Sequence, residues 1–334
     1  MTLTELQQLL DAARAPCDVF GDDLVMGFRR LAGICHPDRY THGTPEAALA
    51  SELFKRLGQW KTMATTSRPS VVSPQRTYQL GRRIGRGDLC DVYEGSCDEE
   101  TFVLKIPRIA TGNNLLAKER EVLEQLIEQS RDDLYDQYFP RPVETFRTED
   151  RRINVFQWRD GFYDAERIHK RHHAGLDGRH LAWMFNRLLE VLGYLHRKGW
   201  MHGAVVPAHL MFHAENHGLQ LVGWIHAVQL NQPLTLVPEK RKSWYPPECH
   251  RREPVGPASD IYLAAKSLVY LSGGQLLDTS SSEGIPFPIR QFIRACLLES
   301  PRMRPQDAWA LREEFSELLE GVYGSPRYHR LEMP

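Results

Sequence analysis

The chain has 334 residues, 42% apolar and 25% charged, the composition of a globular protein large enough for two or three domains. Its 42 Lys and Arg nearly balance 43 Asp and Glu, and the net charge of -1 excludes the overall basic field of a nucleic-acid-binding or polybasic membrane protein. No apolar run reaches the ~18 residues of a membrane span, and the N-terminus lacks the pattern of a signal peptide. The six cysteines form no Cys-x-x-Cys pair, which favours a reducing, cytoplasmic location without a metal site.

Residues 1–64 are predicted to form a small helical domain. Two of its helices carry apolar residues at helical spacing and flank a loop that begins at His36, because Pro37 must end the first of them. The apolar residues are Leu24, Phe28, Leu31 and Cys35 in the first helix and Leu53, Phe54, Leu57 and Trp60 in the second.

This helix, loop and helix with the sequence His36–Pro37–Asp38 resembles the J domain of DnaJ-type co-chaperones. The resemblance implies that His36, Pro37 and Asp38 contact the ATPase domain of a DnaK-type 70-kDa chaperone, and that Arg29 and Arg30 form the basic helix face. The block departs from the family in holding seven Lys and Arg against eight Asp and Glu, and its first helix lacks the usual aromatic signature. The alternative interpretation is a structural helical hairpin with a turn at His36.

Residues 65–77 contain two prolines and no periodicity, and are predicted to be a linker. Short strand-like segments follow at 78–85, 91–97 and 101–107, then an amphipathic helix over 113–129 and a further strand at 152–158. Helices dominate residues 178–320, and the polar tail from 324 is expected to fray. The predicted fold is α+β, with a second domain over residues 78–330 whose β-rich part precedes a helical part.

The second domain resembles the bilobal fold of eukaryotic-type protein kinases. Gly85 and Gly87 stand in a glycine-rich turn where backbone φ above 0° is permitted, Lys105 follows on a strand and Glu119 on a helix, the arrangement that binds nucleotide phosphates in that family. Further motifs follow in the family's order, from a catalytic-loop-like segment at His202 to a terminal arginine motif. The resemblance gives Glu248, Asp260 and Arg304 structural roles in holding the catalytic loop and activation segment.

The positions that carry the chemistry in kinases are altered. The residue at the catalytic aspartate is Ala204, and Val206, His209 and Gly223 stand at the phosphate-binding lysine, the second metal-binding asparagine and the metal-binding aspartate. Loss of a general base alone typically costs ~10²–10⁴ in rate. Cys90 also replaces the third glycine of the turn. The pattern indicates a pseudokinase that binds either no cofactor or ATP without a tightly held Mg²⁺.

Three functions are compatible with this sequence. The first is a non-catalytic adaptor that binds a protein partner through the kinase-like domain and recruits the chaperone through the J-like domain, with no nucleic acid or membrane involved. The second is an ATP-dependent transferase of phosphoryl or AMP groups, in which Glu215, Glu119 or His209 replaces the missing carboxylates. The third is an interaction module that does not contact a chaperone.

Overall fold

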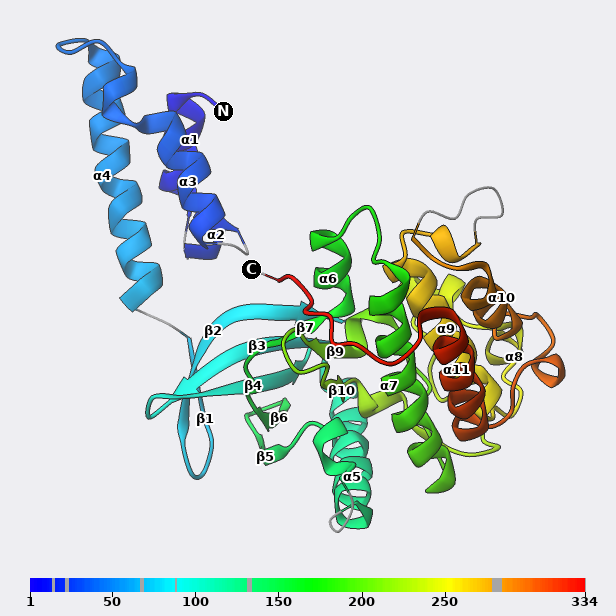
Figure 1. Ribbon diagram of the computed structural model, residues 1–334. Coiled ribbons are helices and arrows are strands. Elements are labelled where there is room, and N and C mark those ends of the chain that lie inside the picture. Colours follow the sequence, from blue (N-terminus) through cyan, green and yellow to red (C-terminus); the bar gives the residue numbers. More distant parts are fainter. Residues whose placement is uncertain are drawn as a thin grey trace. The chain divides into compact units, whose positions relative to one another are not determined.

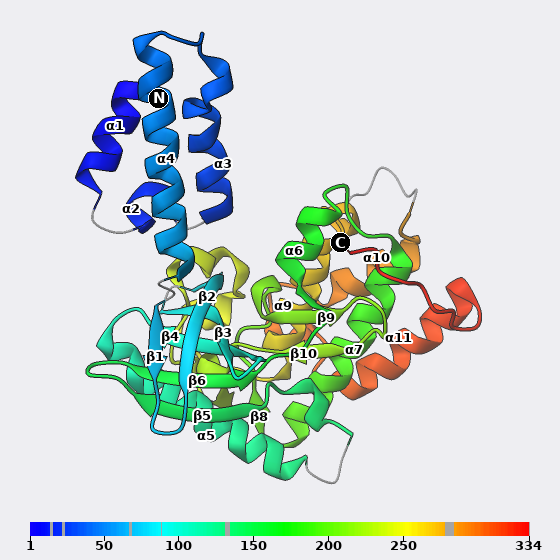
Figure 2. The same cartoon turned by 90° about the vertical axis from the view of Figure 1, so that its left-hand side faces the viewer.

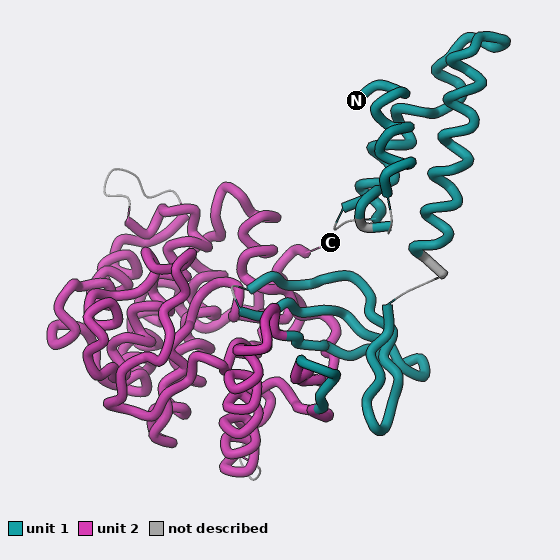
Figure 3. The backbone as a smooth tube through the Cα atoms, turned by 180° about the vertical axis from the view of Figure 1, so that it is seen from behind, with its two compact units in different colours: residues 1–106, 146–150 teal, residues 107–145, 151–334 magenta. Residues whose placement is uncertain are grey.

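The computed structural model describes residues 1–13, 16–21, 24–66, 69–87, 89–130, 134–277 and 284–333, with the side chains of 17, 65 and 66 left out. The chain divides into two compact units, one of residues 1–106 and 146–150 and the other of residues 107–145 and 151–334 (Figure 3). No helix in the described ranges is both long and apolar enough to cross a membrane. The fold is mixed α and β, as predicted.

The N-terminal helical block has its own apolar core. It consists of α1 (Leu3–Ala12), α2 (Pro16–Phe20), α3 (Leu24–Cys35), the 3₁₀ helix η1 (Pro37–Arg39) and α4 (Pro45–Thr66), and α1 and α3 both run alongside α4 (Figure 2). The buried residues are Leu6, Leu10, Val19, Phe20, Leu31, Cys35, Leu53 and Leu57. Helix α2, which the periodicity did not predict, is too short to show an apolar period.

Four strands follow in the first unit, β1 (Ser70–Val72), β2 (Thr77–Arg86), β3 (Cys90–Cys97) and β4 (Glu100–Pro107). Strand β1 lies inside the predicted linker and pairs antiparallel with β2, while residues 67–68 of that linker lie outside the described part. A turn closes this hairpin, because the backbone N–H of Ser73 donates to the carbonyl of Arg76 at 2.8 Å and the Arg76 N–H donates to the Ser73 hydroxyl at 2.9 Å. The two prolines of the predicted linker therefore flank a strand that the composition did not predict.

The second unit contains α5 (Asn113–Gln129), η3 (Asp136–Tyr138) and β6 (Arg152–Gln157), and it shares β5 (Pro142–Arg147) with the first unit. Its helical part contains α6 (Ala165–Arg171), α7 (Gly178–Arg197), α8 (Pro247–His250), α9 (Pro257–Leu271), α10 (Phe287–Ala295) and α11 (Ala308–Tyr323) (Figure 1). The antiparallel strands β7 (Phe162–Asp164), β9 (Leu210–His213) and β10 (Leu219–Leu221) form one small sheet, and β8 (Trp200–Met201) pairs with β11 (Val228–Gln229).

Helix α7 is the centre of the helical part. It is buried along most of its length and packs against both α9 and α11. The contact with α11 requires a glycine, because a Cβ atom at Gly193 would lie 2.7 Å from the Trp309 ring. Asp177 caps the N-terminus of α7 by accepting from the N–H groups of Arg179 and His180.

The expectation of a frayed C-terminal tail is wrong. Leu331 is fully buried and its N–H donates to the carbonyl of Ala214 at 3.2 Å. The imidazole of His217 stacks between Trp183, at 4.1 Å, and Tyr328 of the tail, at 4.7 Å. Polar composition indicated fraying, but the contacts of Leu331 and Tyr328 join the tail to residues more than a hundred positions earlier, and a local pattern cannot predict them.

Candidate functional site

The loop between β8 and the 3₁₀ helix η4 (Pro207–His209) is held by one buried carboxylate. Asp260 on α9 has no solvent exposure and accepts hydrogen bonds from the N–H groups of His202 and Gly203, each at 2.9 Å. Its Oδ2 also lies 3.2 Å from Nε2 of His196 on α7. Gly203 has φ +71°, and a Cβ there would meet the carbonyl oxygen of His226 at 2.9 Å. The loop therefore keeps a fixed path through backbone contacts.

The predicted positions Ala204, Val206 and His209 come together within this loop. Ala204 and Val206 are fully buried, so the residue that the resemblance matches to the catalytic aspartate presents a methyl group to the interior. Nδ1 of His209 lies 2.9 Å from the carbonyl oxygen of Ala204, and the Val222 N–H donates to the carbonyl of His209 at 3.0 Å. These bonds place the His209 ring beside the segment that follows β10.

Gly223 lies directly against this ring. Its φ is +91°, and a Cβ atom at this position would lie 2.7 Å from three atoms of the His209 imidazole. A side chain at 223 is therefore excluded both by backbone strain and by contact with the ring. Mg²⁺ prefers carboxylate and other oxygen ligands in octahedral geometry, so an imidazole and a glycine do not fit that ion. Among the residues described, no group of His, Cys, Asp or Glu is arranged to hold a metal ion.

The segment after Gly223 forms η5 (Trp224–His226) and is packed, not open. Trp224 is fully buried, its Nε1 donates to the carbonyl of Leu221 at 2.7 Å, and its ring contacts His202 at 4.7 Å edge to face. Helix α5 packs against η5. Glu119 on α5 is 2% exposed and accepts from Nδ2 of Asn154 at 3.3 Å. Sequence reasoning missed the role of Trp224, whose only signal was a large aromatic residue within the altered metal-binding motif.

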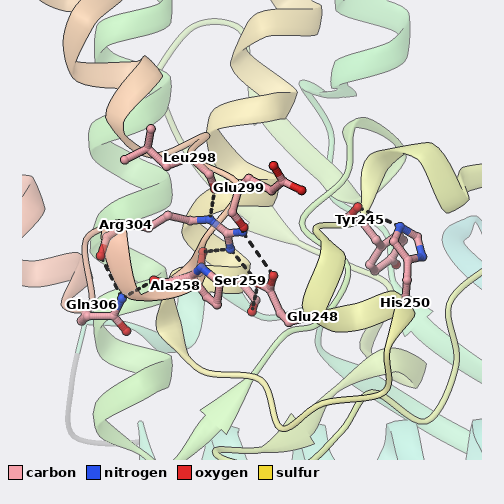
Figure 4. Close-up of polar contacts among 10 residues, drawn as sticks. Tyr245, Glu248, His250, Ala258, Ser259, Leu298, Glu299, Arg304 and Gln306 are labelled. Carbon is pink, nitrogen blue, oxygen red and sulfur yellow. Dashed lines mark hydrogen bonds and ion pairs between the residues drawn. The ribbon is translucent and has the colours of Figure 1, made fainter.

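The predicted structural pair Glu248 and Arg304 forms a buried bidentate ion pair (Figure 4). The guanidinium donates to the two carboxylate oxygens at 2.6 and 3.1 Å, and the Ser259 hydroxyl donates to Oε1 at 2.8 Å. Arg304 also donates to the carbonyls of Leu298 and Glu299. Burial raises the pKa of Glu248, but the hydrogen bonds from Arg304, the backbone and Ser259 outweigh burial and leave the pKa below its ordinary value.

The remaining nucleotide-site residues of the prediction lie in the first unit. Lys105 is half-buried on β4, and Gly85 lies within β2. Neither Gly85 nor Gly87 has a positive φ. Gly87 is instead required by close approach, because its N–H donates to the Cys90 carbonyl at 2.8 Å and a Cβ would lie 2.9 Å from that oxygen. Gly87 and Cys90 therefore lie opposite each other where β2 and β3 pair, and Cys90 is buried.

The alternative base Glu215 follows β9, whereas His209 precedes that strand. It is exposed in the turn between β9 and β10, and its carboxylate accepts from Arg330 of the tail at 2.9 Å. The structure therefore gives it a role in holding the tail. Tyr138 and Phe139 are buried in the second unit.

The loop at His36 is fixed by the two helices beside it. Arg39 donates to the carbonyl of Gly33, and the Tyr40 hydroxyl donates to that of Ile34 at 2.8 Å, so both cap the C-terminus of α3. The His36 ring contacts Phe54 on α4 edge to face at 5.2 Å. His36 Nδ1 lies 3.6 Å from Asp38, and both side chains are exposed, at 47% and 85%. Arg29 and Arg30 are also exposed on α3.

No protein-family model matches the chain. Among solved structures, the kinase domain of BubR1 is similar, with a TM-score of 0.58 over 76% of this chain and 83% of that domain at 13% sequence identity. An identity this low supports the fold and not the activity. The chain therefore has a protein-kinase-like fold, preceded by a helical block.

Proposed function

We propose that the kinase-like region is a non-catalytic scaffold for a protein partner. The observation that carries the proposal is the His209 ring packed against Gly223, beside a buried Ala204. Phosphoryl transfer depends on a positioned base and on metal ions at the phosphates, and these three residues supply no carboxylate for either task. The frame around them is retained through Asp260 and the Glu248–Arg304 pair.

The test is transfer of radiolabel from γ-³²P-ATP and from α-³²P-ATP to the protein itself and to added substrate proteins, with Mg²⁺ or Mn²⁺. We expect no transfer above that of heat-denatured protein, because Ala204 and Gly223 leave the reaction without its acid–base and metal-binding groups. The matched variants are His209→Ala within the loop and His250→Ala, whose ring lies on α8. Label transfer that His209→Ala abolishes and His250→Ala preserves would establish the transferase instead.

We further propose that the helical block recruits a 70-kDa chaperone of the DnaK type. The support is the exposed His36 and Asp38 on a loop that Arg39 and Tyr40 tie to α3, with Arg29 and Arg30 exposed on the same helix. Two exposed apolar side chains, Val25 and Met26, lie on that helix as well, at 59% and 64% exposure. Cations beside exposed apolar residues suit a partner with an acidic rim around an apolar contact.

The test is stimulation of the chaperone's ATPase by the full chain. His36→Gln and Asp38→Asn should each remove the stimulation, since both side chains are exposed and neither belongs to the core. His42→Gln is the control, because His42 is an exposed histidine of the same connection. Equal stimulation by His36→Gln and His42→Gln would leave the block as a structural hairpin, and the kinase-like scaffold would be unaffected by that result.

A further inference from the structure

A cavity of about 530 Å³ lies in the second unit, and none of the described residues that line it belongs to the His209 loop or to the Glu248–Arg304 pair. Its walls come from η3, the segment before and at the start of β7, helix α7 and the turn between β9 and β10; β7, β9, β10 and α7 are marked in Figure 1. The residues that matter here are Gln137, Tyr138, Arg159, Phe162, Arg187 and Asn216. The lining is mainly polar, which distinguishes this cavity from an unfilled apolar void.

Two arginines from separate elements line the cavity, and each contacts η3. Nη1 of Arg159 donates to the carbonyl of Gln137 at 2.7 Å, and Nη1 of Arg187 lies 3.5 Å from the hydroxyl of Tyr138. Both contacts are made to consecutive residues of η3, one to a backbone carbonyl and the other to a side-chain hydroxyl. Among the residues described, each guanidinium hydrogen-bonds only through Nη1, so the other nitrogens are left for a ligand.

The nearby acidic groups balance these charges only in part. Glu190 accepts a hydrogen bond from Arg187 at 2.9 Å. Burial lowers the pKa of the Arg187 guanidinium, but the charges of and hydrogen bonds to Tyr138 and Glu190 outweigh burial and leave the pKa raised. Asp160 also lines the cavity, and its carboxylate accepts from Trp158 Nε1 at 2.8 Å. Burial and the charge of Arg141 lower the pKa of Arg159, while Asp136, which pairs with Arg141, raises it less. Of the two arginines, Arg187 has a carboxylate hydrogen-bond partner, whereas the guanidinium of Arg159 donates to a backbone carbonyl.

We propose that this cavity binds the phosphoryl group of an anionic ligand. Two guanidinium forks from separate elements suit a group with three terminal oxygens better than a carboxylate, which one fork already satisfies. The Asn216 side chain lies in the same lining, and the Phe162 ring, with the Arg159 guanidinium 5.1 Å from its centre, gives the rest of the ligand an apolar face. The volume is that of a small-molecule site. The site is independent of the altered reaction centre.

Calorimetric titration of the full chain with inorganic phosphate and with a capped phosphoserine tripeptide tests this proposal. We expect saturable binding that weakens with added salt and falls on the order of tenfold in Arg159→Gln and Arg187→Gln. Arg302→Gln is the matched control, because Arg302 is an exposed arginine on η8 (Pro301–Met303). Thermal unfolding of each variant identifies any loss of folded protein, and Arg187→Lys provides a milder second variant that keeps the charge without the fork.

The two probes distinguish the sources of the phosphoryl group. Equal affinity for both identifies a free phosphorylated small molecule, and about tenfold tighter binding of the tripeptide identifies a phosphorylated protein segment; both support the proposal. It is overturned if neither probe binds up to about 10 mM, or if Arg159→Gln binds as Arg302→Gln does. Phosphate binding that Lys105→Ala abolishes and Arg159→Gln preserves would place the anion elsewhere and also overturn it.

Discussion

Two parts of the second unit differ sharply, the one that the sequence resemblance matches to the frame of a kinase and the one that it matches to the reaction centre. The Glu248–Arg304 pair and the Asp260 carboxylate are buried, charged and fully engaged in hydrogen bonds, whereas the positions of the reaction centre hold Ala204, Gly223 and an imidazole. The physical reason is the cost of change. Truncating one member of a buried ion pair leaves an isolated charge in the interior, while replacing a carboxylate that holds a metal by a small neutral residue leaves no charge to compensate.

The comparison is tested most severely by Arg304→Ala. This change leaves Glu248 buried without its bidentate partner, and we expect the free energy of unfolding to fall by about 3–5 kcal/mol. Urea denaturation followed by far-UV circular dichroism measures the effect. Arg302→Ala, two residues away and exposed, should stay within about 0.5 kcal/mol of the wild type. A loss of similar size in both variants would show that the buried pair has no special role.

A smaller effect is expected for Asp260→Asn. The amide keeps one oxygen acceptor but turns an NH₂ group toward one of the two backbone N–H donors at His202 and Gly203. We expect a loss of about 2 kcal/mol, together with faster amide hydrogen exchange at both residues. Unchanged exchange at His202 and Gly203 would mean that the loop holds its path without the carboxylate.

Gly223→Ala probes the reaction centre itself. The added Cβ meets the His209 ring at 2.7 Å in a left-handed backbone, and we expect a cost of about 2–3 kcal/mol from strain and contact together. Gly199→Ala is the control, because its φ is +83° and its added Cβ has no neighbour within 4 Å, so it measures the backbone cost alone. His209→Ala in the Gly223→Ala background should recover the difference. Failure to recover it would show that the ring does not occupy this space.

The smallest expected effect is a pH dependence of the docked tail. Burial lowers the pKa of both His180 and His217. At His180 the carboxylate of Asp177 raises the pKa, while the charges of the histidines at 217, 172 and 329 lower it further. At His217 a hydrogen bond to the His329 backbone raises the pKa, while the charges of Arg187 and His329 lower it further. In the folded protein the pKa values of these two histidines lie below the ordinary histidine value of about 6.5 in the unfolded chain. The stability that the neutral imidazoles contribute is therefore fully present above about pH 6.5, and it is lost as the pH falls through the folded pKa values.

Protonation also breaks a specific bond, since Trp183 Nε1 donates to Nδ1 of His180 at 3.2 Å. We expect the melting temperature to fall by a few °C between pH 7.5 and pH 5.5. The decrease should be smaller in His180→Gln and unchanged in His42→Gln, whose side chain is exposed in the first unit. An equal decrease in all three proteins would assign the pH dependence to other groups.

Local sequence signals predicted the elements well where a single apolar face decided them. The helix expected over 113–129 is α5 with the same bounds, because its apolar residues repeat at helical spacing and its core face is continuous. The strand expected at 152–158 is β6, shorter by one residue. The same signals missed β1, where pairing with β2 overcame an unfavourable composition, and α2, which has too few residues for a period.

The assignment of Ala204, His209 and Gly223 to the candidate site rests on motif order and stays a prediction. Their packing could not be predicted from the sequence. That the His209 ring fills the space beside Gly223, that Trp224 is buried against His202 and that η3 anchors both Arg159 and Arg187 depend on distances between separate elements. A local pattern carries no information on such distances.

By itself, the sequence determined the fold class and the order of the elements, because these follow from residue identity and short-range periodicity. Only the tertiary structure decided where the tail lies, which groups hold Asp260 and Glu248, and that Arg159 and Arg187 line the same cavity. These features arise from side chains that are distant in the chain and adjacent in space, and their free energy depends on burial and geometry that only the folded chain has.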